Sequence, residues 1–377
     1  WIHLNMDYPF NLKGILYFPK INTEYDSIEG TIKLYNNQVF IADNIKEVIP
    51  EFLLLLKGVI DCPDLPLNVS RSALQNDGFV QKISEYIAKK VADKLTGMCK
   101  TDREAYEKYW DDISPFIKFG CIKDSKFADK LHDYILFKDL DNKYLTLKDC
   151  IEANKKEEAE HTEEETQENA EENKDEKEPE KTTVFYVTDP VQQSQYINMF
   201  KEAGKNAVIL SHNIDTAFIS HLEQRDQTLQ FKRIDADLTE ELKGGDAADD
   251  DTAKTLTELF RKNLNKEKLE VKVESLKNEA VSAMMMLSEE SRRMQDMMKM
   301  YNMYGMDPGM FGGQETLVLN INHPLVKFLA ENQESEHAAV ICEQLYDLAM
   351  ISHKQLSPDE MTKFVQRSND ILMLLTK

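Results

Sequence analysis

The sequence is short of cysteine, of long apolar runs and of positive charge. Its five cysteines are scattered, odd in number and never in a CxxC pair, which argues against disulfides or a zinc site and favours a reducing cytoplasm. No apolar run approaches the roughly 20 residues that span a bilayer, and no signal-peptide pattern is present. The 46 Lys and Arg against 68 Asp and Glu give a net charge of −22. That charge repels phosphate backbones and anionic lipid, so we expect neither nucleic acid nor a membrane as a partner.

Several catalytic signatures are also missing. The eight histidines show no metal-ligand spacing. Residues 305–313 are rich in glycine but lack the lysine and the spacing of a P-loop. Ser211, His212 and Asp215 lie close together in the sequence, but nothing marks a nucleophile elbow there. We therefore disfavour a free-standing hydrolase. Labelling of Ser211 by a probe for hydrolases would favour it instead.

Residues 1–151 have the pattern of a large α/β unit with a helical extension. Strands are predicted at 14–18, 31–35 and 39–42. The run 49–58 (IPEFLLLLKG) predicts a helix, with proline near its start and glycine at its end. A second helix is predicted where apolar residues recur at helical spacing, at Phe79, Ile83, Tyr86, Ile87, Val91 and Leu95. Residues 101–150 are expected to be mostly helical, with core anchors at Trp110, Phe116 and Phe119.

Residues 152–181 differ in kind from what precedes them. They hold fourteen acidic and five basic residues, and three alanines are their only apolar side chains. Such a segment cannot bury enough apolar surface to offset the entropy of ordering. We therefore expect a disordered acidic linker. A solvated spacer is favoured over a binding site for basic partners.

Residues 182–240 predict a small α/β unit. Its expected strands are 183–187, 207–210 and 229–234, and its expected helices are 190–203 and 215–223. Strands that alternate with helices in this way form a βαβ unit with a parallel sheet. Residues 241–254 then become polar and glycine-rich, which predicts a second linker.

Residues 255–377 predict a mainly helical C-terminal domain with one short strand at 316–320. Ten of the sixteen methionines fall between Met284 and Met310, and residues 288–304 can form a helix. One face of this helix carries Met294, Met297, Met298 and Tyr301. Stripes of this kind usually pack in a core, but a methionine surface also adapts to many apolar shapes. We expect this face to be exposed, because the patch exceeds what one helix needs.

Two amphipathic helices are expected to close the chain. The first carries Ile341, Leu345 and Leu348. The second begins at residues 357–360 (SPDE), a capping box with proline at the first helical position. Its apolar stripe consists of Met361, Phe364, Val365, Leu372 and Leu375. Both stripes could pack within the chain or against another chain.

Residues 63–75 (PDLPLNVSRSALQ) form the stretch around which the chain is organised. Two prolines keep the backbone before Leu67 extended. Ser72 and Gln75 then fit a capping box at the start of a helix. This arrangement holds Arg71 at a fixed place, and a planar guanidinium there suits a phosphate or a carboxylate. From the spacing alone, an ordinary salt bridge that braces the loop is the favoured role.

This stretch resembles the arginine loop in the middle domain of the 90-kDa heat-shock protein family, which consists of ATP-dependent dimeric chaperones. Residues 64–71 and Leu74-Gln75 carry this likeness. Other stretches resemble the bacterial form of the family, namely 1–10 (WIHLNMDYPF), 14–19 (GILYFP), 37–43 (NQVFIAD), 186–189 (YVTD) and 322–325 (NHPL). The resemblance therefore spans most of the chain. It implies middle plus C-terminal domains without the N-terminal ATP-binding domain, and we take the chain, which begins with Trp1, to be a fragment.

The resemblance also implies roles for single residues around the ATP. In relatives the arginine that matches Arg71 reaches the N-terminal domain and contacts the terminal phosphate of bound ATP. Asn68 and Gln75 are secondary catalytic candidates. ATP with Mg would be bound by the missing domain, so we expect the fragment alone to turn over no ATP.

Partners follow from the same resemblance. The methionine face would contact partly folded client proteins. The family's acidic-aromatic pair for clients corresponds to Thr216-Ala217 here, so the neighbouring Phe218 is a further candidate. The last two helices would pair with those of a second chain as a four-helix interface. The alternative to an ATP-dependent chaperone is a nucleotide-independent dimeric scaffold that binds proteins, and the coding sequence before Trp1 would separate the two.

Overall fold

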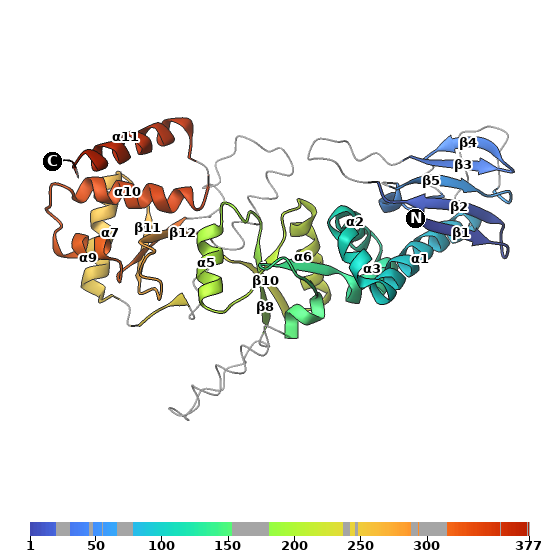
Figure 1. The fold of residues 1–377 in the computed structure, drawn as a ribbon, viewed down its shortest axis with the longest axis horizontal. Helices are drawn as coiled ribbons and strands as arrows, with labels where there is room; N and C mark the ends of the chain where they lie inside the picture. The colour runs from blue at the N-terminus through green and yellow to red at the C-terminus, as the bar shows by residue number, and fades with distance from the viewer. Residues whose placement is uncertain are drawn as a thin grey trace, which may run out of the picture. The chain divides into compact units, whose positions relative to one another are not determined.

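The chain is a mixed α/β protein that divides into two compact units (Figure 1). The computed structural model describes residues 1–19, 31–44, 48–54, 56–65, 78–152, 181–236, 242–245, 248–287, 293, 315–354, 356–374 and 376. Unit 1 comprises Trp1–Phe137, Tyr144–Pro179 and His212–Thr228. Unit 2 comprises Lys138–Lys143, Glu180–Ser211 and Leu229–Lys377. The mixed character agrees with the fold class expected from the sequence.

Unit 1 begins with a five-stranded sheet in the order β1-β2-β5-β3-β4. Its strands are β1 (Ile2–Met6), β2 (Leu12–Tyr17), β3 (Ile32–Asn36), β4 (Val39–Asp43) and β5 (Lys57–Asp61). Neighbouring strands are antiparallel except β3 and β5, which are parallel. Buried apolar residues alternate along β1, β2 and β3, as one covered face of a sheet requires. The three strands predicted at 14–18, 31–35 and 39–42 are confirmed.

The helix predicted over 49–58 is wrong. The structure has a single 3₁₀ turn at Glu51–Leu53, and the chain then enters β5. The apolar run is buried at Phe52, Leu53 and Leu56, and periodicity cannot tell such a run from a buried strand. Gly58 explains the strand, because a Cβ there would lie 2.2 Å from the Ile15 carbonyl oxygen on β2. The glycine thus permits close strand pairing and does not end a helix.

Helices account for most of the rest of unit 1. They are α1 (Gly78–Thr101), α2 (Arg103–Lys123), α3 (Ser125–Leu131) and α6 (Ile214–Arg225), with a 3₁₀ turn at His132–Tyr134 and a short strand β7 (Tyr144–Thr146). Asp102 and Asp124 cap α2 and α3 by accepting hydrogen bonds from the amides of Ala105 and Phe127. The helix predicted after residue 78 is confirmed. Trp110 and Phe116 are buried as expected, whereas Phe119 is only half-buried.

Unit 2 contains the small parallel sheet that the sequence predicts. Strands β8 (Thr182–Val187), β9 (Val208–Ile209) and β10 (Leu229–Arg233) are parallel, and α5 (Ser194–Glu202) lies between β8 and β9 in the chain. Lys138 and Asp139 of β6 (Leu136–Asp139) pair antiparallel with β9. The order within unit 2 is β10-β8-β9-β6.

The remainder of unit 2 is less helical than expected. A three-stranded sheet has the order β11-β13-β12, in which β11 is parallel and β12 antiparallel to β13. Its strands are β11 (Glu270–Glu274), β12 (Ala283–Met286) and β13 (Thr316–Asn320), and the helices are α7 (Asp250–Leu264), α9 (Pro324–Glu331), α10 (Ala338–Ile351) and α11 (Pro358–Leu374). Of these three strands only β13 was predicted, whereas both closing helices, α10 and α11, were predicted. Helix α7 begins inside the stretch 241–254, where Asp249 caps it.

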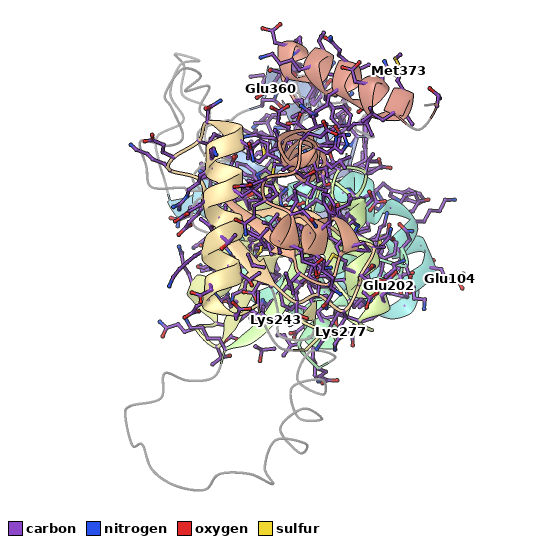
Figure 2. All side chains as sticks on the ribbon, turned by 90° about the vertical axis from the view of Figure 1, so that its left-hand side faces the viewer. Glu104, Glu202, Lys243, Lys277, Glu360 and Met373 are labelled. Carbon is purple, nitrogen blue, oxygen red and sulfur yellow. The ribbon has the colours of Figure 1, made fainter. Side chains whose placement is uncertain are left out.

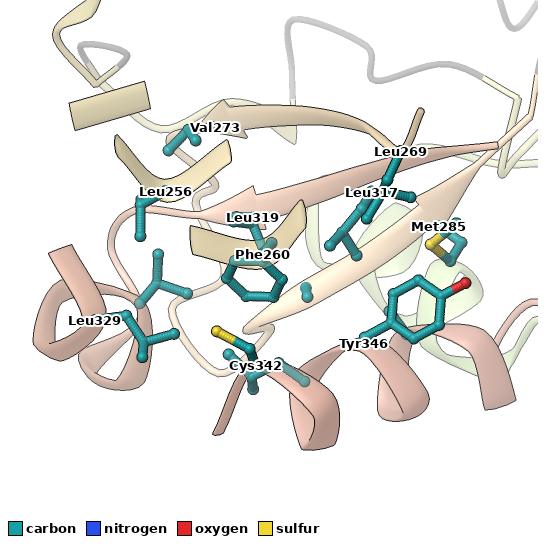
Figure 3. Packing of buried hydrophobic residues seen from close by; sticks show 14 of the residues in the cluster. Leu256, Phe260, Leu269, Val273, Met285, Leu317, Leu319, Leu329, Cys342 and Tyr346 are labelled. Atoms are coloured by element: carbon teal, nitrogen blue, oxygen red, sulfur yellow. The ribbon is translucent and has the colours of Figure 1, made fainter. Parts of the chain in front are cut away.

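One apolar core joins these elements of unit 2, apart from α11 (Figure 3). Phe260 of α7 and Cys342 of α10 lie between the helices and the sheet strand that carries Leu317. Tyr196 of α5 donates a hydrogen bond of 2.6 Å to the carbonyl oxygen of Met285 on β12. The parallel sheet and the C-terminal elements are thus packed as a single unit.

The NHPL stretch at 322–325 has a structural role here. Asn322 donates hydrogen bonds from Nδ2 to Ser275 Oγ at 2.8 Å and to the Leu276 carbonyl at 3.1 Å. His323 caps α9 by accepting a hydrogen bond from the Leu325 amide at Nδ1. The stretch therefore fixes the turn that follows β13 to the end of β11.

Candidate functional site

The arginine stretch is anchored on both sides. Arg71, Asn68 and Gln75 lie in residues 66–77, outside the described residues. The last described residue before them is Leu65, which is buried. The first described residue after them is Gly78, where α1 begins.

The entry to the stretch is held by Asn11, in the turn before β2, and by Tyr35 and Asn36 of β3. The Asp64 carboxylate accepts hydrogen bonds from the Asn11 backbone amide at 2.7 Å and from Asn11 Nδ2 at 3.1 Å. Asn36 Nδ2 donates to the Pro63 carbonyl at 3.1 Å. The Cys62 amide donates to the Tyr35 carbonyl at 3.0 Å. These bonds fix residues 62–64, which follow β5 directly, against the turn before β2 and against β3.

The exit from the stretch is held by aromatic packing. The Phe79 ring meets the Phe10 ring edge-on, with 5.5 Å between centroids, and Tyr86 meets Phe10 at 6.0 Å. The Tyr86 hydroxyl donates a hydrogen bond of 2.8 Å to the Asn5 carbonyl. Phe10 and Asn11 are neighbours in the turn between β1 and β2, so this one turn contacts both ends of the arginine stretch. We call Phe10, Asn11, Asp64 and Phe79 the turn clamp.

The sequence did not reveal the turn clamp. Its contacts join residues 53 positions apart in the case of Asn11 and Asp64, and no local pattern connects them. The adjacent Cys62 thiol is not a reactive group, because burial raises its pKa to about 11. All five cysteines are buried. The described residues here offer contacts on both sides of residues 66–77.

The proposed client surface lies largely outside the described residues. Met294, Met297, Met298 and Tyr301 are not described. Of the same methionine-rich segment, Met284 and Met285 on β12 are buried in the core of unit 2. This part of the segment therefore packs within the chain.

Phe218 is placed in the interior of unit 1. It is fully buried on α6, beside the Lys118 ammonium at 5.8 Å from the ring centroid. Lys118 of α2 and Asp215 of α6 form a buried ion pair, which fixes α6 against α2. Phe218 therefore presents no surface to a client in this structure.

Ser211, His212 and Asp215 do not form a catalytic triad. The Asp215 carboxylate accepts hydrogen bonds from Lys118 and from the His212 backbone amide. The His212 ring accepts a hydrogen bond from the Ile214 amide at Nδ1. The carboxylate does not orient the imidazole, as a triad requires. Among the described residues, no cluster of three or more His, Cys, Asp or Glu could hold a metal ion.

The closing helices carry an exposed apolar surface. Val365 and Leu372 on α11 are 50% and 58% exposed, and Met361 and Leu348 are also exposed. Figure 2 shows Met373 and Glu360 at opposite ends of α11, with side chains directed outward. Ile341 and Phe364 are half-buried, Leu345 is buried in the core, and Leu375 is not described. The exposed members of the expected interface therefore lie mainly on α11.

No described helix is both long and apolar enough to cross a membrane.

Comparison with known proteins places this chain in a family. The sequence model described as Hsp90 protein matches residues 1–162 and 176–377. Chaperone protein HtpG of Bacteroides fragilis is 38% identical over 353 residues, which are 90% of this chain and 49% of the relative. The protein of that name from Porphyromonas gingivalis is 36% identical, with 89% and 48% coverage, and that of Helicobacter acinonychis is 28% identical, with 97% and 54% coverage. The chain spans about half the length of these relatives, and it belongs to the Hsp90 family.

Proposed function

We propose that this chain is the middle and C-terminal part of an ATP-dependent molecular chaperone. The match to the Hsp90 family along nearly the whole chain carries the proposal, together with relatives that are named chaperones. The intact protein would bind ATP with Mg in its N-terminal domain and act on partly folded client proteins in the cytoplasm. It would work as a homodimer, with neither nucleic acid nor membrane as a partner.

Arg71 is the residue that this chain would supply to ATP hydrolysis. A guanidinium next to the transferred phosphate stabilises the charge of the transition state, and in other nucleotide hydrolases this is worth about 10³-fold in rate. Such a contribution requires that the arginine be presented at a fixed place. The turn clamp supports this role, because it holds the chain at Asp64, before Arg71, and at Phe79, after it. Asn68 and Gln75 would assist from the same stretch.

ATP turnover by the reassembled protein tests the proposal. The chain alone should hydrolyse no ATP, and addition of the N-terminal domain should restore turnover. Arg71→Ala should then lower turnover by about 10³-fold, and Arg71→Lys should recover little of it, because a lysine lacks the planar fork. Lys89→Ala is the matched control, since it removes an exposed cation from α1 without touching the arginine stretch. Unchanged turnover in Arg71→Ala would remove the assigned role.

The homodimer is the second part of the proposal. Helix α11 exposes Met361, Val365 and Leu372, and a surface of this kind on a helix pair suits a four-helix interface. The methionine face at Met294, Met297, Met298 and Tyr301 remains a proposed client surface. If the reassembled protein bound clients but never turned over ATP, the nucleotide-independent scaffold would be the better description.

A further inference from the structure

Helix α11 is attached to its own chain by polar contacts. Figure 1 shows it running alongside α10, and the two helices are in contact. None of the described residues of α11 is buried. Phe364 and Ile371 of α11 are half-buried, and polar contacts with α10 add to the packing that these two side chains provide.

One arginine makes most of these contacts. Arg367 donates from Nε to Gln344 Oε1 at 3.0 Å and from Nη1 to Glu343 Oε2 at 3.0 Å, and its Nη2 contacts the Asp347 carboxylate. Gln344 also donates to Ser368 Oγ at 3.1 Å. These three partners lie within about one turn of α10, at residues 343, 344 and 347. All three guanidinium nitrogens therefore contact the same turn. We call Arg367 with Glu343, Gln344 and Asp347 the arginine clasp.

The clasp depends on the shape of the guanidinium. Three acceptors in different directions match a planar fork, whereas a lysine ammonium offers one point of contact. The Arg367 and Asp347 side chains are only 13% and 17% exposed, so solvent screens this pair less than a surface pair. Without Arg367, two carboxylates would face each other four residues apart on α10, which is unfavourable.

The clasp also determines which way α11 faces. At 3.6 residues per turn, Met361, Val365 and Leu372 lie about 120–160° around the helix from Arg367. A helix is stiff about its own axis, so a clasp on one side directs the opposite side away from α10. The apolar stripe is exposed for this reason.

We propose that Arg367 is the positioning residue that turns the apolar stripe of α11 toward a second copy of this chain. The inference rests on the homodimer of the proposed function. Two copies with a net charge of −22 each repel one another, so a shared interface needs an uncharged surface. Met361, Val365 and Leu372 provide that surface, while the clasp offsets part of the negative charge of Glu343 and Asp347 inside each chain.

Dimer dissociation constants of clasp variants test the inference. Arg367→Met keeps the apolar stem and removes the donors, and it should weaken the dimer at least tenfold in sedimentation experiments. Arg367→Lys should leave the dimer weakened, because the three N–H groups of a lysine sit on one nitrogen and cannot reach the three acceptors that the guanidinium contacts from three nitrogens. Lys363→Met is the matched control, since it removes an exposed cation one turn earlier on α11 and should change the constant less than twofold. Circular dichroism should show equal helix content in all variants.

Rescue by a tether separates positioning from a general loss of stability. In the Arg367→Met protein, cysteines at Gln344 and Ser368 can be joined by a short bismaleimide, since these side chains touch. The native cysteines are buried and leave the label to the new pair. The tether should restore dimerisation if Arg367 acts by holding α11 in place. The same pair with Arg367 retained must still dimerise when tethered.

The failures of the two proposals differ. A wild-type dimer that stays equally tight in Arg367→Met overturns the positioning role and leaves the homodimer intact. A weakened variant that the tether does not rescue, while the tethered control dimerises, also overturns it. A wild-type chain that never dimerises overturns the homodimer and the positioning role together.

Discussion

Helices α10 and α11 are in contact with each other, but they differ in how many of their residues are buried. Helix α10 buries six residues in the core of unit 2, among them Cys342, Leu345 and Tyr346. Helix α11 is longer, yet none of its described residues is buried. Apolar spacing in the sequence predicts a stripe on both helices without saying what covers it. The structure shows that the core of unit 2 takes up Leu345 of the α10 stripe, whereas Leu348 and most of the α11 stripe are exposed.

This difference indicates that the two helices have different roles. Helix α10 stabilises the chain, and its remaining polar turn provides the acceptors for the arginine clasp. Helix α11 contributes little apolar burial to the fold and is held as an outward-facing surface. Substitutions on the two helices should therefore affect different measurements.

The largest effect is expected from Leu345→Asp in α10. Leu345 is 1% exposed, and an unpaired carboxylate there adds the cost of a buried charge to the loss of packing. We expect a loss of more than about 4 kcal/mol in the free energy of unfolding of unit 2, measured by urea denaturation. Leu345→Met, which keeps the volume, should cost less than about 1.5 kcal/mol. A stable Leu345→Asp protein would show that α10 is not a core helix.

Next in size is Leu372→Asp in α11. The change places a charge in the apolar stripe, and we expect the dimer to weaken about 100-fold, which is about 2.7 kcal/mol. The free energy of unfolding of the monomer, measured by urea denaturation at protein concentrations below the dissociation constant, should stay within about 0.5 kcal/mol of the wild type, because the site is exposed. Asn369→Asp, at an exposed neighbour outside the stripe, serves as the control. Loss of monomer stability in Leu372→Asp would mean that α11 packs into its own chain.

The connection between the two helices should respond to acid. His353 and Lys354 lie between α10 and α11, and they hold the Glu315 carboxylate so that its pKa falls from 4.5 to about 2. A lowered pKa in the folded state adds stability above pH 4.5, and this stability is lost as the pH falls toward 2.

Solvent screening limits this contribution to about 1–2 kcal/mol. Glu315→Gln should therefore lower the melting temperature at pH 7 and reduce its fall between pH 7 and pH 3. A variant that loses as much stability to acid as the wild type would exclude Glu315 as the sensitive group. Glu331→Gln, an exposed change in α9, is the control.

The smallest effect is expected at the start of α11. Ser357 and Glu360 form the predicted capping box, with Ser357 donating to Glu360 Oε2 at 2.7 Å and the Glu360 amide donating back at 3.4 Å. Ser357→Ala should destabilise α11 by about 1 kcal/mol, visible as faster amide exchange in its first turn. Exchange rates that match the wild type would show that the clasp alone holds the helix.

Local patterns predicted those elements whose own residues decide their structure. Strand β13 agrees with the predicted bounds, and the capping box at Ser357 is present. Strands β11 and β12 were missed because they depend on pairing with β13, and β12 is rich in methionine, which favours helices in isolation. The run at 49–58 failed for a similar reason, since β5 is defined by β2 and β3.

The candidate sites divide in the same way. Residues such as Val365 and Leu372 could be named from helical spacing, and the structure leaves them exposed. The burial of Phe218 could not be predicted from the sequence, because Phe218 packs beside Lys118, which lies 100 residues earlier in the chain. The turn clamp and the arginine clasp were not predicted either, since each joins side chains that only the fold brings together.

Sedimentation equilibrium of the whole chain at micromolar concentration tests the central claim most directly. If the open stripe of α11 meets a second copy, the protein should sediment at twice its mass of 43.6 kDa, and Leu372→Asp should return it to the single mass. A wild-type protein that sediments at 43.6 kDa throughout the micromolar range would contradict the account.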